Sequence, residues 1–507
     1  MKTIRIGTFV HSATSPGDYP RPLFHLRFLF VALSVATALH AALPAPVPLP
    51  TAGIDLPVIG RIKVRTAAEI KSSPWSIGGE TLDRNYADYA KYKAYLGPLG
   101  AKGIRLQAGW ARCERVPGVY EWDWLDAVID DALAQGVQPW LQLSYGNPLY
   151  SGGGDARLGG GLPSSPEALA AWDRWVRALA ERYRDRVREW EVWNEPDLNT
   201  HGVVPVEAYV GLYIRTATIL RELQPAGRIY ALALARTPAY ADKFLSGMQA
   251  RNQLALIDAI TIHNYPRNPD DTQLTDQVRA IIAKYGHSIQ VRQGETGALS
   301  CYQENFALKR ISLTETIQAK WNLRRLLAYW AKDVPMNLFT LSDMHYLQAD
   351  NQGVGENGVQ MNYKGLLATN PDRSIAALKP AYLAAQVVFT VIDDTLERLP
   401  HYPFSSTALR GVALTGYQRT TGDGQVAAYW FADAPPAEAN GVTLADLALP
   451  GGRFREPVLV DVRTNRVYAI PPAQWIQSAE GTAFRRVPVY DAPMLIAEKS
   501  ALPLEPI

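Results

Sequence analysis

The sequence predicts an α/β protein: a (β/α)8 TIM barrel followed by a C-terminal antiparallel β-sandwich. From about residue 72, short apolar runs alternate with amphipathic segments of helical period, as in βαβ units around a parallel sheet. Two of these runs end in glutamates, Glu195 and Glu295, at the strand ends where barrel proteins keep their reactive groups. Beyond the helical segment Pro380–Asp393, the pattern changes to short alternating runs with turn residues, which is typical of a sandwich.

Eight apolar runs are the expected barrel strands, a number that fits a closed barrel. They are Trp75–Gly78, Ile104–Ala108, Gln138–Leu143, Glu189–Trp193, Ile229–Leu234, Ala259–His263, Ile289–Arg292 and Met336–Leu341. The outer helices are expected at Leu125–Ala134, Ala168–Tyr183, Val206–Leu223 and Glu315–Ala331. Sandwich strands are expected at Val426–Phe431, Pro457–Val462 and Met494–Glu498.

The 507 residues suffice for a barrel of ~250 to 400 residues plus a smaller module. We place a leader and proline-rich linker at 1–50, the barrel at 51–390 and the sandwich at 391–507. Arg21 and Arg27 precede the apolar run Phe28–Leu39, which is shorter than the ~20 residues of a spanning helix and is typical of a secretory signal. The expected location is periplasmic or extracellular, without stable membrane insertion once the signal is removed; retention of the segment as an anchor is the alternative.

Composition narrows the classes of partner. Lys and Arg number 51 against 49 Asp and Glu, so the net charge of +2 argues against nucleic acid and acidic membranes as partners. The 13 Trp and 25 Tyr suit stacking on sugar rings, although large barrels contain many aromatics in any case. Cys113 and Cys301 either pair or stay free, and nothing resembles a metal-binding Cys/His cluster. A reaction carried by two glutamates would need no metal and no organic cofactor.

Glu195 lies in the run Trp193–Pro196, and Glu295 lies in Gly294–Gly297, 100 residues further on. About three βα units fit between them, so the two carboxyl groups would face each other across the barrel mouth. Glycosidic bond cleavage needs one group that protonates the leaving oxygen and another that stabilises or attacks the anomeric carbon. A separation of ~5 to 5.5 Å would indicate a retaining reaction, and ~6.5 to 9.5 Å an inverting one.

The run Trp193–Asp197 resembles the acid/base motif of the retaining clan A glycoside hydrolases. Within that clan, the chain is similar to family 39, which includes β-xylosidases, α-L-iduronidase and exopolysaccharide hydrolases. Further runs carry this resemblance, in the same order: Glu191–Leu198, Phe339–Asp343, Lys364–Leu367 and Lys379–Tyr382. The run Gly294–Gly297 departs from the family pattern. The resemblance implies that Glu195 is the acid/base, Glu295 the nucleophile and Asn194 the partner of the sugar's 2-hydroxyl.

The resemblance also implies that His263 and Tyr265, at the end of the sixth strand, contact the nucleophile and the substrate. Arg105 either supports the nucleophile or forms an ion pair inside the barrel. Trp110 either stacks on a sugar or fills the top of the barrel. Asp343, with Ser342 and His345 beside it, either binds substrate hydroxyls or braces a loop, and Glu304 is the reserve nucleophile.

These features predict a retaining O-glycosyl hydrolase that cleaves a β-linked oligosaccharide or polysaccharide by double displacement. Glu195 would be kept protonated by the negative charge of Glu295. Two alternatives stay open: a non-catalytic polysaccharide-binding barrel, and a transglycosylase that uses the same glutamates. The glycine-rich segment Gly152–Leu162 lacks the Gly-Lys-Ser/Thr ending of a phosphate loop and is expected to form a mobile rim loop.

Overall fold

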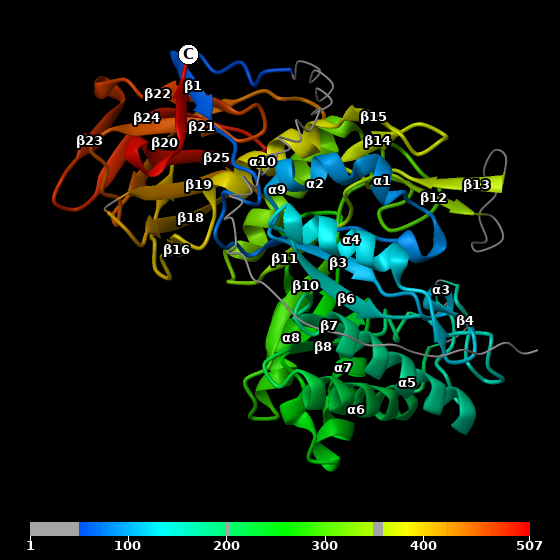
Figure 1. Ribbon diagram of the computed structural model, residues 1–507. Helices are drawn as coiled ribbons and strands as arrows, with labels where there is room; N and C mark the ends of the chain where they lie inside the picture. Colours follow the sequence, from blue (N-terminus) through cyan, green and yellow to red (C-terminus); the bar gives the residue numbers. More distant parts are fainter. Residues whose placement is uncertain (1–49, 158, 199–202, 348–357, 423) are drawn as a thin grey trace, which may run out of the picture. The chain divides into compact units, whose positions relative to one another are not determined.

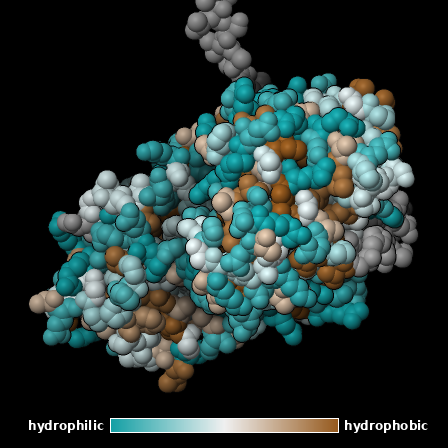
Figure 2. Space-filling model, turned by 90° about the horizontal axis from the view of Figure 1, so that it is seen from below, coloured by the Kyte–Doolittle hydropathy of each residue, from teal (hydrophilic) through white to brown (hydrophobic). Residues whose placement is uncertain are grey.

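The computed structural model describes residues 50–157, 159–198, 203–347, 358–422 and 424–507. The predicted signal segment and most of the linker lie outside these residues. No helix in the described ranges is long and apolar enough to cross a membrane. Figure 2 shows one face of the molecule, on which hydrophilic residues prevail and hydrophobic ones gather in separate patches.

Eight parallel strands close the barrel, which confirms the predicted fold class (Figure 1). In barrel order they are β2 (Trp75–Gly78), β3 (Gly103–Gln107), β6 (Gln138–Leu143), β7 (Glu189–Val192), β8 (Arg228–Leu234), β9 (Ala259–His263), β10 (Gln290–Thr296) and β11 (Met336–Leu338). The largest shifts from expectation concern the last two. β10 continues through Glu295 to Thr296, and β11 ends at Leu338, three residues before its expected end.

Helices follow the barrel strands and shield the barrel from solvent with their apolar faces. The main ones are α2 (Leu96–Leu99), α4 (Asp123–Ala134), α5 (Pro166–Tyr183), α6 (Val206–Leu223), α7 (Pro238–Ala250), α8 (Gln273–Ala283), α9 (Glu315–Trp330) and α10 (Pro380–Val391). Ser165 caps α5 and Thr314 caps α9, each accepting a hydrogen bond from a first-turn backbone N–H, which explains why both begin where they do. Shorter elements decorate the ends of the strands: α1 (Tyr89–Tyr92), α3 (Trp110–Cys113), β4 (Glu114–Val116) with β5 (Val119–Tyr120), β12 (Met344–Leu347) with β13 (Val359–Asn362), and β14 (Leu367–Thr369) with β15 (Ile375–Leu378).

Two antiparallel sheets form the C-terminal sandwich. The larger has the order β16 (Leu396–Arg398), β18 (Val412–Arg419), β19 (Gln425–Phe431), β25 (Met494–Glu498), β21 (Pro457–Asp461), β22 (Arg466–Ala469), β1 (Val58–Ile62) and β26 (Leu504–Pro506). The smaller has the order β17 (Ser405–Ser406), β20 (Thr443–Leu449), β24 (Thr482–Val489) and β23 (Trp475–Gln477). The predicted sandwich is confirmed, but β1 was expected within the barrel segment.

The central strands of the larger sheet, β19, β25 and β21, are buried on both faces. Along β19, Val426, Ala428 and Trp430 join the core that includes the barrel and its helices. The alternate residues Ala427, Tyr429 and Phe431 join the separate core between the two sheets. Successive side chains of a strand point to opposite faces, so a strand covered on both sides is apolar throughout. This explains the continuous apolar run in β19.

Lys320 on α9 links the barrel to the sandwich. Its Nζ donates hydrogen bonds to Asp491 Oδ1 at 2.7 Å and to the carbonyl oxygens of Ala437 and Ala439 at 2.7 and 2.6 Å. The lysine side chain is fully buried. Burial of an ammonium group is tolerated when all its protons find partners, as they do here.

We expect Lys320→Ala to lower the free energy of unfolding by about 3–5 kcal/mol, because it leaves the carboxylate of Asp491 and two carbonyl groups without their donor. Chemical denaturation followed by tryptophan fluorescence measures the change. The matched control is Lys243→Ala on α7, an exposed lysine; we expect it to change stability by no more than about 0.5 kcal/mol. Equal effects of the two substitutions would contradict the linking role of Lys320.

Candidate active site

Asn194 and Glu195 follow β7 in a turn with unusual backbone angles. Trp193 and Glu195 both have positive φ values, 68° and 48°, which side-chain-bearing residues adopt only when their surroundings hold them there. The Trp193 ring is buried and packs edge-on against Tyr145, with ring centroids 5.6 Å apart. The turn therefore presents Asn194 and Glu195 at the carboxyl end of the barrel.

Glu295 lies on β10 next to an irregularity in the strand pairing. The register with β9 shifts between Gln293 and Glu295, and the register with β11 shifts between Gln293 and Thr296. Such a bulge re-aims side chains. Tyr265 Oη donates to Glu295 Oε1 at 2.6 Å, and Arg105 Nη1 donates to Oε2 at 3.2 Å. A negative charge on the carboxylate strengthens both hydrogen bonds.

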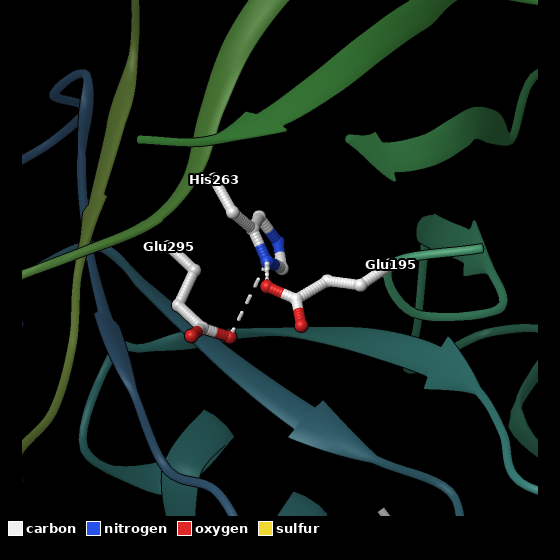
Figure 3. A group of neighbouring side chains, drawn as sticks. All are labelled: Glu195, His263 and Glu295. Carbon is white, nitrogen blue, oxygen red and sulfur yellow. Dashed lines mark hydrogen bonds and ion pairs between the residues drawn. The ribbon is translucent and has the colours of Figure 1, made fainter. Parts of the chain in front are cut away.

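His263, at the end of β9, lies between the two glutamates (Figure 3). Its Nδ1 is 2.9 Å from Glu195 Oε1 and 3.6 Å from Glu295 Oε2. Burial lowers the pKa of His263 to about 4, so the ring is neutral near pH 7. Its Nε2 is 3.4 Å from an Arg105 nitrogen, which only donates, so the single ring proton sits on Nδ1 and is donated to Glu195.

The pKa of Glu195 is raised to about 7, chiefly by burial and next by the negative charge of Asp197. The sequence suggested the charge of Glu295 as the cause, whereas burial contributes most. Glu195 Oε2 has no hydrogen-bond partner in the described part of the chain, whereas Oε1 contacts His263. Oε2 is therefore the oxygen free to hold a proton for a ligand.

The two glutamates are close neighbours. One carboxylate oxygen of each and a ring nitrogen of His263 all lie within 4.8 Å of one another. These three groups are the candidate ligands for a metal ion. The protonated Nδ1 of His263 opposes that use, since the atom facing the carboxylates has no free lone pair.

Arg105 on β3 connects the buried side chains beneath the site by hydrogen bonds. Besides Glu295 it donates to Glu80 at 2.8 Å, to Glu191 at 2.7 Å and to Asn194 Oδ1 at 3.0 Å. Gln142 also donates to Asn194 Oδ1, at 2.8 Å. With its oxygen engaged twice, Asn194 presents its amide nitrogen as the donor for a ligand hydroxyl.

A cavity of about 900 Å³ opens above these side chains. Asn194, Glu195, His263, Tyr265 and Glu295 all line it, so the structure brings together these five predicted residues. Arg105 is fully buried just beneath them. Aromatic rings that suit sugar stacking form part of the wall: Tyr265, Phe306, Phe339 and Tyr346.

Among the charged residues of the cavity that the sequence reasoning missed, two are buried, Glu80 and Lys364. Glu80 follows β2 directly, so the strand-end criterion that identified Glu195 would also have found it. Its pKa is raised to about 7 by burial. Lys364 was noted only as part of a family-like run.

Trp110 and Asp343 are not among the residues that line the cavity. Trp110 is fully buried, donates to Glu114 Oε2 at 2.6 Å and stacks with Trp175 and Tyr150. Of its two predicted roles, the structure favours filling the top of the barrel. Asp343 accepts from Lys379 Nζ at 2.7 Å and from the backbone N–H of Gly365 at 2.9 Å, which corresponds to bracing a loop.

Three other predicted features can be placed. Glu304, the reserve nucleophile, is exposed and pairs with Arg310. Cys113 and Cys301 are both unpaired, and burial raises the pKa of the Cys113 thiol to about 12. Gly159, from the glycine-rich segment, lines the cavity; the mobility of that segment stays a prediction.

Comparison with known proteins agrees with this site. The family profile described as "Glycosyl hydrolases family 39" matches residues 111–294, which include Asn194, Glu195 and His263. A 6-phospho-beta-glucosidase from Clostridium longisporum is 28% identical over 127 residues, or 22% of this chain. That match spans 25% of the length of the relative.

Solved structures share the fold over most of the chain. A family 39 glycoside hydrolase from the gut symbiont Bacteroides cellulosilyticus WH2 has a TM-score of 0.59 at 15% identity, covering 86% of this chain and 81% of that one. A monomeric beta-xylosidase from Caulobacter crescentus CB15 has a TM-score of 0.56 at 17% identity, covering 88% and 98%. At these identities the likeness is one of fold. Together with the family profile over residues 111–294, it makes the chain similar to the glycoside hydrolases of family 39.

Proposed function

We propose that the chain hydrolyses β-linked O-glycosides with retention of configuration, through a covalent glycosyl-enzyme. The observation that carries the proposal is the spacing of the two glutamates, whose nearest carboxylate oxygens lie within 4.8 Å. This spacing supports the retaining geometry of ~5–5.5 Å between carboxyl groups, because an inverting pair stands ~6.5–9.5 Å apart to admit a water.

In the first step Glu295, as a carboxylate, attacks the anomeric carbon while Glu195 donates its proton to the leaving oxygen. Glu195 suits this role because its pKa of about 7 keeps a proton available at neutral pH. Arg105 and Tyr265 hold the two oxygens of Glu295 in place for the attack. The amide of Asn194 is placed to donate to the 2-hydroxyl, a contact that strengthens in the transition state.

In the second step Glu195, now a carboxylate, takes a proton from water as the water attacks the glycosyl-enzyme. The sugar leaves with its original configuration and Glu295 regains its negative charge. The neutral His263 supports Glu195 in both steps by donating its Nδ1 proton to Oε1, which leaves Oε2 for the proton in transit.

Export of the enzyme to the periplasm or the medium is part of the proposal. It rests on the apolar run Phe28–Leu39 and its basic flank. Cell fractionation followed by N-terminal sequencing of the recovered protein tests it.

Aryl glycosides test the catalytic proposal. The panel includes β-xylosides and 6-phospho-β-glucosides, because relatives with those activities share sequence or fold with this chain. We expect Glu195→Gln to lower kcat/KM by about 10²–10⁴ and Glu295→Gln by about a thousandfold or more. Proton NMR of the first-formed sugar would show the β-anomer. Release of the α-anomer would contradict double displacement. If the wild-type protein binds glycans but hydrolyses none of the glycosides, the non-catalytic alternative remains.

The pH dependence of kcat/KM follows from the pKa of Glu195. Because the protonated form is needed, the rate should fall as the pH rises through about 7. Asp197 raises that pKa, so Asp197→Asn should move the alkaline limb to lower pH. Initial rates between pH 4 and 9 measure both, with circular dichroism as the folding control. The pKa of Glu80 is also raised to about 7. If Asp197→Asn leaves the alkaline limb of the kcat/KM profile at the same pH, that limb reflects the titration of Glu80 and not that of Glu195.

A further inference from the structure

Lys364 is a buried lysine whose amino group has no hydrogen-bond or ion-pair partner among the residues that the structure describes. It follows β13, lines the cavity and is only 2% exposed. Its Nζ lies 5.4 Å from the ring centroid of Tyr265 and 5.3 Å from that of Phe306. Within the described ranges, no side chain or carbonyl accepts a hydrogen bond from this nitrogen, and no carboxylate pairs with it.

Other buried lysines of this protein are treated differently. Lys320 has three oxygen partners, and Lys379 donates to Asp343, Ser300 and the Tyr363 carbonyl at 2.7, 3.0 and 3.5 Å. Burial without such partners makes the charged form of an ammonium group costly. Accordingly, burial lowers the pKa of Lys364 to about 7. An anion brought into the cavity would supply the missing partner.

The rim of the cavity carries the same sign of charge. Arg236, Arg267 and Lys309 are exposed, line the cavity and form no ion pair with any described residue. The acidic residues among the lining are Glu80, Glu195 and Glu295. They lie together around Arg105 and His263, and the mechanism engages two of them, Glu195 and Glu295. Unpaired cations at the rim of a pocket attract anionic ligands.

Lys364 is close enough to act on the sugar that reacts. The ring beneath its amino group belongs to Tyr265, whose hydroxyl is 2.6 Å from Glu295. A pyranose ring seated with its anomeric carbon at Glu295 would therefore have its substituents within reach of Lys364.

We propose that the substrate is an acidic glycan and that Lys364 binds an anionic group on the sugar in the catalytic subsite. The carboxylate that forms carbon 6 of a uronic acid and a phosphate on carbon 6 share this chemistry. Arg236, Arg267 and Lys309 would meet further negative charges along the chain. This inference rests on the proposed glycosidase function and adds the substrate class to it.

Matched pairs of aryl glycosides test the inference. The 4-nitrophenyl β-glucuronide and β-galacturonide are compared with the neutral glucoside and galactoside, and the 6-phospho-glucoside forms a separate arm that distinguishes phosphate from carboxylate. We expect wild type to prefer an acidic member of a pair. Lys364→Met should reduce the acidic-to-neutral ratio of kcat/KM about ten- to hundredfold, mainly through KM, because one charge-assisted hydrogen bond is lost.

Two further variants serve as controls. Lys364→Arg keeps the charge and should retain most of the preference, whereas Lys243→Met removes an exposed lysine of α7 and should leave the ratio unaltered. A wild-type preference for the neutral member of every pair would overturn the inference. So would an equal loss on both members in Lys364→Met, which would mean that the lysine acts on the glutamates and not on the substrate.

Calorimetry separates this inference from the proposed function. Glucuronate, galacturonate and glucose 6-phosphate are titrated into the full chain beside glucose and galactose, and Lys364→Met should weaken only the acidic ligands. If no glycoside is hydrolysed while this difference in binding persists, the proposed function fails and the acidic subsite stands. If neutral glycosides are hydrolysed and acidic sugars gain nothing from Lys364, the inference alone fails.

Discussion

The guanidinium of Arg105 is the constraint on which the arrangement of the site depends. Fully buried, it donates to Glu80, Glu191, Glu295 and Asn194, so one rigid fork fixes four groups from the ends of three strands, β2, β7 and β10. A single positive charge faces three carboxyl groups there. Glu80, whose pKa is raised to about 7 by burial, is the one that most readily takes up a proton. Glu295 keeps two donors, one from Arg105 and one from Tyr265, and remains suited to act as a carboxylate.

The sandwich contributes to the same site through the loop after β9, which carries Tyr265. Trp430 of β19 donates to Asp270 Oδ1 at 2.7 Å, and Asn268 donates to the Ala432 carbonyl at 3.0 Å. From α9, Arg324 donates to Asp270 Oδ2 at 2.8 Å. The loop is therefore held from the sandwich and from the barrel wall at once. The position of the Tyr265 hydroxyl, which contacts Glu295, depends on both, so the C-terminal sandwich helps to orient the nucleophile.

Sequence reasoning reached the barrel, the sandwich and the pair Glu195 and Glu295 because these rest on local patterns: alternation along strands, helical period and a carboxyl group at a strand end. It failed where position depends on packing between distant segments. Trp110 follows a strand just as Glu195 follows one, yet its ring turns into an aromatic cluster with Trp175. Lys364 sits in a loop far from either glutamate in sequence, and only the tertiary fold places it in the cavity. The pairing of β1 with β22, about 400 residues away, leaves no local signal either.

The pairing of β1 makes the barrel an insertion within the sandwich. β1 lies beside β22 (Figure 1) and pairs with β26 on its other side. Gly60 approaches β26 so closely that a Cβ there would be 2.5 Å from the Glu505 carbonyl oxygen. During synthesis this strand emerges before the barrel, and its partners β22 and β26 emerge after it. The larger sheet can be completed only after β26 has left the ribosome. If the chain were cut at the apparent boundary near residue 390, the N-terminal piece would carry β1 without its partners. The C-terminal piece would carry β22 and β26 without the strand that lies between them.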